Sequence, residues 1–389
     1  MSDSEERLVR GYNGRLLVAI SIGWMAIQAG RLAIGPLVPT IKTSLDISST
    51  QVGFAITVIW GLYAILQYPS GRLSDNLTRK TLLVVGLVSL SGGFVLLASA
   101  TTYGVFLVGA VVIGAGAGLY PTAARALVSD LYVRKRGAAY GIHTASGDLG
   151  GVIAAGLAAV VVGAVAWQFT FVPVILSLLS VAAVLHVFSR EAYEFSWVDL
   201  EIKTTLRRLL TSIQFRWLLV GYSLYAFTWQ ATTGFLPAYL ELGKGFAPIV
   251  AKIAFAFLFG VGVVIKPVAG RLGDIFSRKS LSAIVLIIAG IALSGVILSA
   301  SPIIAVVAVI VFAAGLMAFP PLMQAYLMDS FPTESAGGDL GATRAIYIGV
   351  GSLGPTYVGV IADVFSYDLA FVGLVGGLFL SAGIIIFGS

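Results

Sequence analysis

Twelve long apolar stretches follow one another along this chain, and they limit how it can fold more than any other feature. Each is about 20 residues or longer, which is the length that a helix needs to cross the hydrocarbon core of a bilayer. Strands of a membrane barrel would alternate polar and apolar residues over about 10 positions, whereas residues 104–119, 284–298 and 303–317 are almost continuously apolar. The sequence therefore predicts an all-α bundle of membrane helices.

The predicted spans form two groups of six, separated by one long polar interval at residues 189–214. We expect a six-helix bundle at 1–188, a cytoplasmic linker at 189–214 with an amphipathic helix on the membrane surface, and a second bundle at 215–389. The predicted spans are residues 14–39, 49–71, 80–100, 104–131, 137–163, 167–188, 215–240, 247–270, 280–300, 302–329, 338–363 and 367–387.

Composition excludes several other classes of protein. Charged residues make up 11% of the chain, against about a quarter in soluble domains. There is no cysteine, which excludes disulfides and thiolate metal sites. The glycine run at 114–118 lies inside a span and lacks the Lys and Ser/Thr of a phosphate-binding loop. We therefore expect no enzyme, no metal and no cofactor, and the first polar residues show no cleavable signal pattern.

The basic residues indicate how the chain is oriented in the membrane. Of the 24 Lys and Arg residues, 17 fall on the side of the N-terminus, three on the other side and four inside spans. The positive-inside rule then places both termini and the linker in the cytoplasm. The net charge of +6 reflects this topology, so we expect a multi-pass plasma-membrane protein in contact with the lipid bilayer and no nucleic-acid partner.

An internal repeat relates the two groups of spans. The segment GRLSDNLTRK at 71–80 recurs as GRLGDIFSRK at 270–279, an offset of 199 residues with six of ten positions identical. At the same offset, Pro121 aligns with Pro320 and Asp130 with Asp329. Parallel repeats of this kind in transporters place the substrate site at their interface, near the middle of the bilayer.

On these residues the chain resembles the major facilitator superfamily, whose signature between helices 2 and 3 reads approximately G-x-L-[AS]-D-[RK]-x-G-R-K. Asn76 and Ile275 replace the usual basic residue, and Thr78 and Ser277 replace the usual glycine. The resemblance implies twelve helices in two pseudo-symmetric bundles, alternating access to a central cavity, and a monomer. The matching positions are Gly71, Leu73, Asp75, Arg79 and Lys80, and in the second copy Gly270, Leu272, Asp274, Arg278 and Lys279.

These motif residues are predicted to act in gating. Asp75 ends its span on the cytoplasmic side, where its carboxylate can meet Arg134 or Arg136 and the positive N-terminal end of the span at 338–363. That contact would hold the cytoplasmic gate closed. Asp274, in the second copy of the motif, is the weaker candidate for the same role. The alternative is that Arg79 and Lys80 only anchor a short loop to anionic headgroups.

Two arginines inside spans are candidate substrate residues, because a charge at that depth is costly unless it faces protein or water. Arg31 shares a helix face with Trp24 and Gln28, and Arg125 lies in YPTAAR at 120–125. Both resemble arginines of the anion and organic-acid symporter branch of the superfamily. At 1.5 Å per residue they lie roughly 15 Å apart in depth. This separation favours two successive sites along a transport path over a single site in which both arginines hold one anion. The alternatives are snorkelling for Arg31 and a structural ion pair with Asp130 or another buried carboxylate for Arg125.

Several other polar residues inside spans are weaker candidates. Lys266 is interpreted as either a lysine that snorkels to the interface or a functional residue inside its span. Arg344 is interpreted as either an end charge or a cavity residue with Tyr347 on its face. A polar and aromatic patch suits an organic ligand, with helix packing as the alternative. Its members are Tyr225, Trp229, Gln230 and, at the repeat position of Arg125, Gln324.

Proton coupling is predicted at two titratable residues. Asp148 is the one acidic residue well inside an apolar span, and His143 titrates near neutral pH. They lie about 140° apart around a helix, so they need not share a pocket. Related symporters often have an acidic residue at the position of Gly30. A proton-coupling role at that position therefore cannot be carried over to this chain.

The sequence thus favours proton-coupled movement of a small organic anion. The glycines at 147–151 resemble part of a motif in proton-driven exporters. Efflux of lipophilic or cationic compounds is therefore the alternative, followed by a sensor or scaffold with this fold.

Overall fold

The computed structural model describes residues 8–161, 166–194, 213–330 and 336–388, and these form almost only helices. Ten helical segments in this part of the chain are long and apolar enough to cross a membrane, and the long helices α5 and α8 run beside them. The prediction of an all-α membrane protein is confirmed. The amphipathic linker helix was predicted across residues that lie largely outside the described ones.

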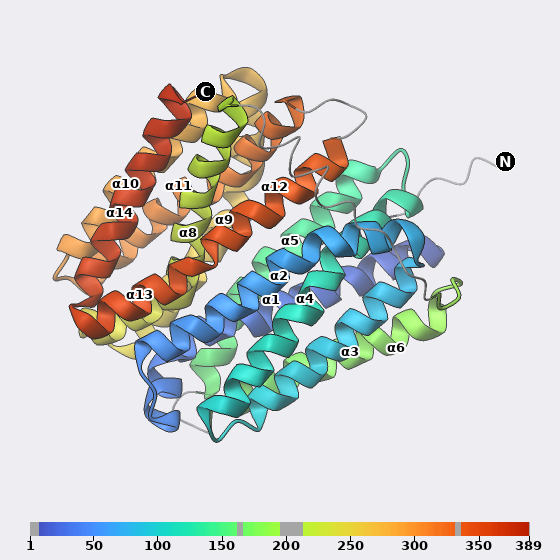
Figure 1. Cartoon of the computed structure of the whole chain (residues 1–389), viewed down its shortest axis with the longest axis horizontal. Helices are drawn as coiled ribbons and strands as arrows, with labels where there is room; N and C mark the ends of the chain where they lie inside the picture. The colour runs from blue at the N-terminus through green and yellow to red at the C-terminus, as the bar shows by residue number, and fades with distance from the viewer. Residues whose placement is uncertain (1–7, 162–165, 195–212, 331–335, 389) are drawn as a thin grey trace.

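The helices before the linker form the N-terminal half, and those after it form the C-terminal half (Figure 1). A short 3-10 turn, Trp167–Phe171, precedes α6, and a π-helical turn, Tyr239–Gly243, follows α8. The N-terminal half contains α1 (Gly11–Leu45), α2 (Ser49–Asn76), α3 (Arg79–Ala98), α4 (Tyr103–Leu131), α5 (Arg136–Val161) and α6 (Val172–Phe188). The C-terminal half contains α8 (Ile213–Ala238), α9 (Pro248–Ile275), α10 (Arg278–Leu298), α11 (Pro302–Ser330), α12 (Ala336–Gly351), α13 (Leu353–Val364) and α14 (Tyr367–Phe387).

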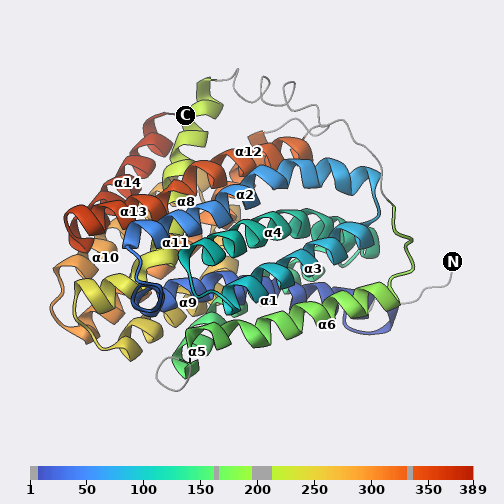
Figure 2. The same ribbon diagram turned by 60° about the horizontal axis from the view of Figure 1, so that its bottom comes forward.

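The two halves meet chiefly at four pairs of helices: α1 with α8, α5 with α9, α2 with α12, and α2 with α13. Figure 2 shows α2 lying beside α12 and α13 along much of its length. The other helices, among them α3, α6, α10 and α14, pack within their own half. The central helices therefore position whatever lies between the halves.

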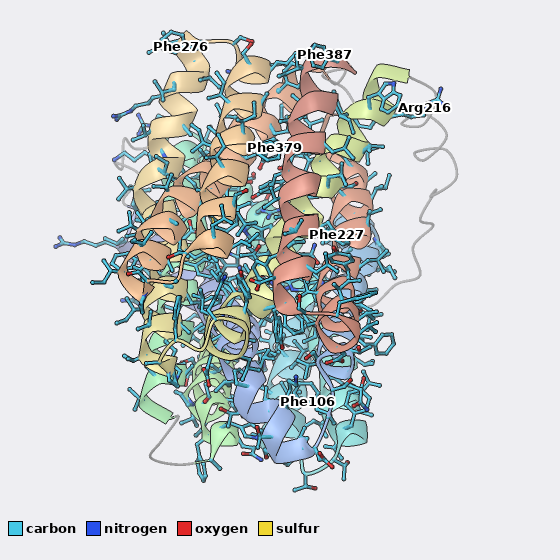
Figure 3. The ribbon with its side chains drawn as sticks, turned by 90° about the vertical axis from the view of Figure 1, so that its left-hand side faces the viewer. Phe106, Arg216, Phe227, Phe276, Phe379 and Phe387 are labelled. Atoms are coloured by element: carbon cyan, nitrogen blue, oxygen red, sulfur yellow. The ribbon has the colours of Figure 1, made fainter. Side chains whose placement is uncertain are left out.

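The outer surface of the bundle is apolar, as a bilayer requires. Phe276, Phe379 and Phe387 lie on the outside of the C-terminal half (Figure 3), and all three are exposed. A water-soluble protein rarely exposes so many large apolar side chains together. Their exposure is consistent with contact to lipid chains.

Hydroxyl side chains set the starts of α3 and α10. Thr78 accepts a hydrogen bond from the backbone N–H of Thr81, and Ser277 accepts one from Ser280. Each satisfies a donor that a helix N-terminus leaves unpaired. Thr78 and Ser277 are the repeat-related positions at which the sequence departs from the glycine of the family signature, so both departures provide helix caps.

The span predicted at 338–363 is divided into two helices, α12 and α13, at Ser352. Pro355 has no N–H to donate to the carbonyl one turn earlier, which weakens the helix there. Thr57 of α2 fills the break: its hydroxyl donates to the Ser352 carbonyl at 2.5 Å and accepts from the Thr356 N–H at 3.3 Å. The N-terminal half thus completes the hydrogen bonding of the C-terminal half.

Candidate functional site

A cavity of about 190 Å³ lies between the two halves, lined by side chains from both. It is smaller than the roughly 300–1,000 Å³ typical of sites for drug-sized ligands. Three cations but no carboxylate are among the described residues that line it. The lining consists of Trp24, Gln28, Arg31, Trp60, Tyr63, Tyr222, Tyr225, Ala226, Trp229, Gln230, Lys266, Met317, Pro320, Gln324, Arg344, Tyr347 and Ile348.

Arg31 is the most deeply buried of the three cations, with 5% of its surface exposed. One of its terminal nitrogens donates to the side-chain oxygen of Gln28, one turn earlier on α1. Its guanidinium carbon lies 4.3 Å from the Trp60 ring centre and 4.6 Å from that of Tyr63. Its Nε and Nη1 atoms have no hydrogen-bond partner within the described part of the chain. A buried cation with unused donors is costly unless an anion or water meets it.

Arg344 of α12 approaches the same place from the C-terminal half. It interacts with Tyr63, Tyr222 and Tyr347, and its Nε is buried with no partner among the described residues. Tyr63 interacts with both Arg31 and Arg344. The two guanidinium groups, one from each half, therefore share a tyrosine.

Arg125 lies next to this pair but does not line the cavity. It interacts electrostatically with Arg344, Tyr63 and Tyr347. Asp130, its suggested partner, is paired with Arg79 instead, at 3.0 Å. Arg31, Arg344 and Arg125 therefore surround Tyr63. The second arginine that lines the cavity is Arg344, which the sequence ranks below Arg125.

An ion pair joins the halves beside the cavity. The Lys266 ammonium of α9 lies 2.5 Å from the Asp148 carboxylate of α5, with side-chain exposures of 26% and 10%. The interpretation of Lys266 as a snorkelling lysine is thus wrong, because its ammonium turns inward to the opposite half. The sequence leaves a helix-packing hydrogen bond or a pair with Arg125 as alternatives to proton coupling at Asp148; its salt-bridge partner in the structure is Lys266.

Most of the predicted substrate residues come together in the cavity. Gln28, Arg31, Tyr225, Trp229, Gln230 and Gln324 all line it. Gln230 donates to the Ile348 carbonyl at 3.0 Å, while its side-chain oxygen has no partner among the described residues. His143 is buried against Trp24 outside the cavity lining, 6.1 Å between ring centres.

Aromatic residues from both halves form much of the wall. The rings of Trp60 on α2 and Trp229 on α8 meet edge to face at 5.3 Å. Those of Tyr222 and Tyr347 lie 4.0 Å apart. Trp60 and Tyr222 could not be singled out from the sequence, because aromatic residues on membrane helices are also common in packing.

The repeated motif forms the same ion pair in each half. Arg79 bonds Asp130 and the Ser74 hydroxyl, while Arg278 bonds Asp329 and Asp274. Each arginine thus ties the start of one helix to the end of another within its own half.

Lys80 and Arg136 also contact their own half. Lys80 donates to the Ser189 carbonyl, and Arg136 donates to the carbonyls of Ser129 and Tyr132. Arg134 and Lys279 have partners as well, and Gly71 and Gly270 lie where a side chain would meet no close backbone. The Asp75 side chain lies outside the described residues, so its role in holding the gate closed stays a prediction.

Glycines allow the central helices to approach closely. A Cβ on Gly147 or Gly150 would collide with α1, and one on Gly151 would collide with the Phe259 ring of α9. On the C-terminal side, Gly351 and Gly354 lie equally close to α8. Small residues therefore let the helices approach closely at both glycine patterns, and the motif at 147–151 packs the helix that carries Asp148.

The halves are closed against each other at the distal end, which is the end of the bundle where α1 passes into α2 and α13 into α14. The Asp363 carboxylate of α13 accepts from the Ser49 N–H at 3.1 Å, and from the N–H and hydroxyl of Thr50, both at 2.7 Å. It therefore sits on the positive N-terminal end of α2. Gly53 and Gly359 let the two backbones meet around it.

We expect Asp363→Ala to open the distal end. Loss of a carboxylate that caps a helix costs about 0.5–2 kcal/mol, which is roughly a 2- to 30-fold shift in the equilibrium between closed and open forms. Because the chain has no cysteine, Thr101→Cys and Ala300→Cys can carry spin labels on the two halves. Pulsed EPR should then show that a larger fraction of molecules has the longer distance between the two labels.

Asp368→Ala is the matched control for this experiment, since Asp368 bonds Tyr239 and Lys244 within its own half. Equal distance distributions in the Asp363 and Asp368 variants would contradict a role for Asp363 in closure.

Comparison with known proteins is consistent with this architecture. Residues 20–355 match the family model described as Major Facilitator Superfamily. A nitrite extrusion protein of Bacillus subtilis (strain 168) is 26% identical over 290 residues, covering 73% of this chain and 72% of that protein. A probable nitrate transporter of Staphylococcus carnosus (strain TM300) is 24% identical over 258 residues, 66% of each chain.

Solved structures share the fold at low identity. A bacterial homolog of the human lysosomal transporter Spinster, in an inward-facing and occupied conformation, superposes with a TM-score of 0.85, 18% identity and 97% coverage of both chains. A D-xylose-proton symporter gives a TM-score of 0.76, 16% identity and coverage of 97% and 98%. At these identities the likeness concerns the fold alone.

Proposed function

The chain belongs to the major facilitator superfamily, and on that premise we propose that it moves a small anion across the membrane by alternating access. The observation that carries this proposal is Arg31, a buried guanidinium that faces a cavity between the halves with two nitrogens unpaired among the described residues. An anion bound there would supply the missing hydrogen bonds. Rocking of the halves would then expose it on either side.

The chain is a transporter and not an enzyme, since its family and its named relatives are transporters. It is a multi-pass membrane protein. We place it in the plasma membrane with both termini in the cytoplasm, as the distribution of Lys and Arg favours. In that orientation the closed distal end faces outward.

Size and charge favour a small oxyanion. Arg31, Arg344 and Lys266 make the cavity positive, and its volume is about 190 Å³. Guanidinium groups match planar oxyanions such as nitrate, nitrite and carboxylates, because two N–H donors can bond two oxygens at once. The names of the relatives point to nitrate or nitrite, so we widen the predicted organic anion to include these inorganic ions.

We further propose that protons drive the transport through Asp148. Its partner Lys266 also lines the cavity, so an arriving anion and the Asp148 carboxylate compete for one ammonium. Protonation of Asp148 would release Lys266 to the anion. Proton and anion would then bind together, which is the requirement for symport.

Export of lipophilic cations is disfavoured by the same cavity. Three cationic side chains and no carboxylate line it among the described residues, and Lys266 neutralises nearby Asp148. A cation would meet repulsion there rather than a partner.

We expect nitrate, nitrite or a small carboxylate to stabilise the purified full-length chain against heat. A ligand at 100 times its Kd stabilises the folded state by about 2.7 kcal/mol. The measurement is the melting temperature in detergent at constant ionic strength, with chloride as the reference anion and tetraphenylphosphonium as the lipophilic cation. A rise with tetraphenylphosphonium alone would overturn the anion proposal, as would the same rise with every anion, chloride included.

A further inference from the structure

A second cavity opens on the outer surface of the bundle, and none of the residues that line it also lines the substrate cavity. It is a groove of about 560 Å³ between α1 and α6, two helices that lie side by side in Figure 2. Apolar side chains form most of its walls, and Val18, Ile22 and Leu176 are all exposed in it. In a bilayer this surface faces lipid chains.

Among the described residues, one charged side chain lines the groove. Arg15 of α1 lines it, and its guanidinium carbon is 5.9 Å from the Phe188 ring centre at the end of α6. Arg15 forms no ion pair among the described residues. An anionic group from the bilayer would therefore meet no competing carboxylate among these residues.

The position of Arg15 matches the level of lipid headgroups. The apolar run of α1 begins directly after it, at Leu16. From Arg15 to Ile22 the helix rises about 10 Å, within the roughly 15 Å depth of one leaflet of a 30 Å hydrocarbon core. Arg10 and Arg190 add positive charge at the same end, with Arg190 held 4.4 Å from the Tyr12 ring centre.

We propose that this groove binds one anionic phospholipid in the leaflet nearest the N-terminus. An acyl chain would lie along Val18, Ile22 and Leu176, and the headgroup phosphate would pair with Arg15. Charge complementarity favours this occupant. A lipid without net charge would fill the apolar groove but bring no net negative charge to the arginine. One basic residue at the surface gives about five-fold tighter binding of an anionic lipid.

The test compares phosphatidylglycerol with phosphatidylcholine of the same acyl chains, added to the purified full-length protein in neutral detergent. Native mass spectrometry counts the bound lipids, and the melting temperature gives a second readout. We expect the wild type to prefer phosphatidylglycerol about five-fold, and Arg15→Ala to bind both lipids equally.

Arg216→Ala is the matched control. Arg216 is exposed at the start of α8, the repeat counterpart of α1 (Figure 3), and it does not line the groove. It should keep the preference, whereas Val184→Trp, which fills the groove, should weaken binding of both lipids. A full preference in Arg15→Ala, or an equal loss in Arg216→Ala, would overturn the proposal. Transport is not a readout, so the result is independent of the substrate.

Discussion

Arg31→Ala should weaken binding of the transported anion by roughly 30-fold or more and abolish transport, while the protein still folds. Removing one partner of a desolvated charge pair costs about 2–5 kcal/mol, and Arg31 is the most buried cation of the cavity. Its loss removes both unpaired nitrogens that face the anion. Uptake of the stabilising anion into liposomes, together with its Kd from the thermal titration, measures the effect.

The conservative variant separates charge from shape. Arg31→Lys keeps the positive charge but loses the planar fork, so it should bind an oxyanion with intermediate affinity. Arg216→Ala removes an exposed arginine outside the cavity and should transport normally. Normal transport by folded Arg31→Ala would remove this residue from the binding site.

The positions of the helices could be predicted closely because a bilayer imposes both the length and the apolar character of each span. The predicted span 80–100 corresponds to α3 at Arg79–Ala98, and 367–387 corresponds to α14. The break at Ser352 could not be predicted. Prolines also lie inside helices that continue, such as Pro121 in α4. At Pro355 the break depends on the Thr57 hydroxyl, which arrives from the other half.

The candidate site was predicted only in part, and the reason is geometric. Helical spacing identified Gln28 with Arg31, because neighbours on one face are encoded locally. Depth along isolated spans gave no information about contacts between the halves. Lys266 reaches Asp148 from 118 positions away, and Arg344 meets Tyr63 from the opposite half. Such pairs depend on how the two halves pack together.

The pair of Asp148 and Lys266 leads to the second large effect. Asp148→Asn imitates the protonated acid and frees Lys266, so the anion should bind tightly at every pH. In the wild type, affinity should rise as the pH falls, by up to about tenfold per unit if one proton is bound with the anion. The measurement is the anion Kd between pH 5 and 8, with uptake driven by a pH gradient.

Lys266→Ala tests the same competition from the other side. It removes the shared ammonium, so the anion should bind weakly and protonation of Asp148 should no longer help it. A purely structural ion pair behaves differently, because both single variants would then lower stability and leave the pH dependence of the Kd unchanged. The charge exchange Asp148→Lys with Lys266→Asp should restore the ion pair. If it also restores the pH dependence, the competition for one ammonium, and not the packing of α5 on α9, couples the proton to the anion.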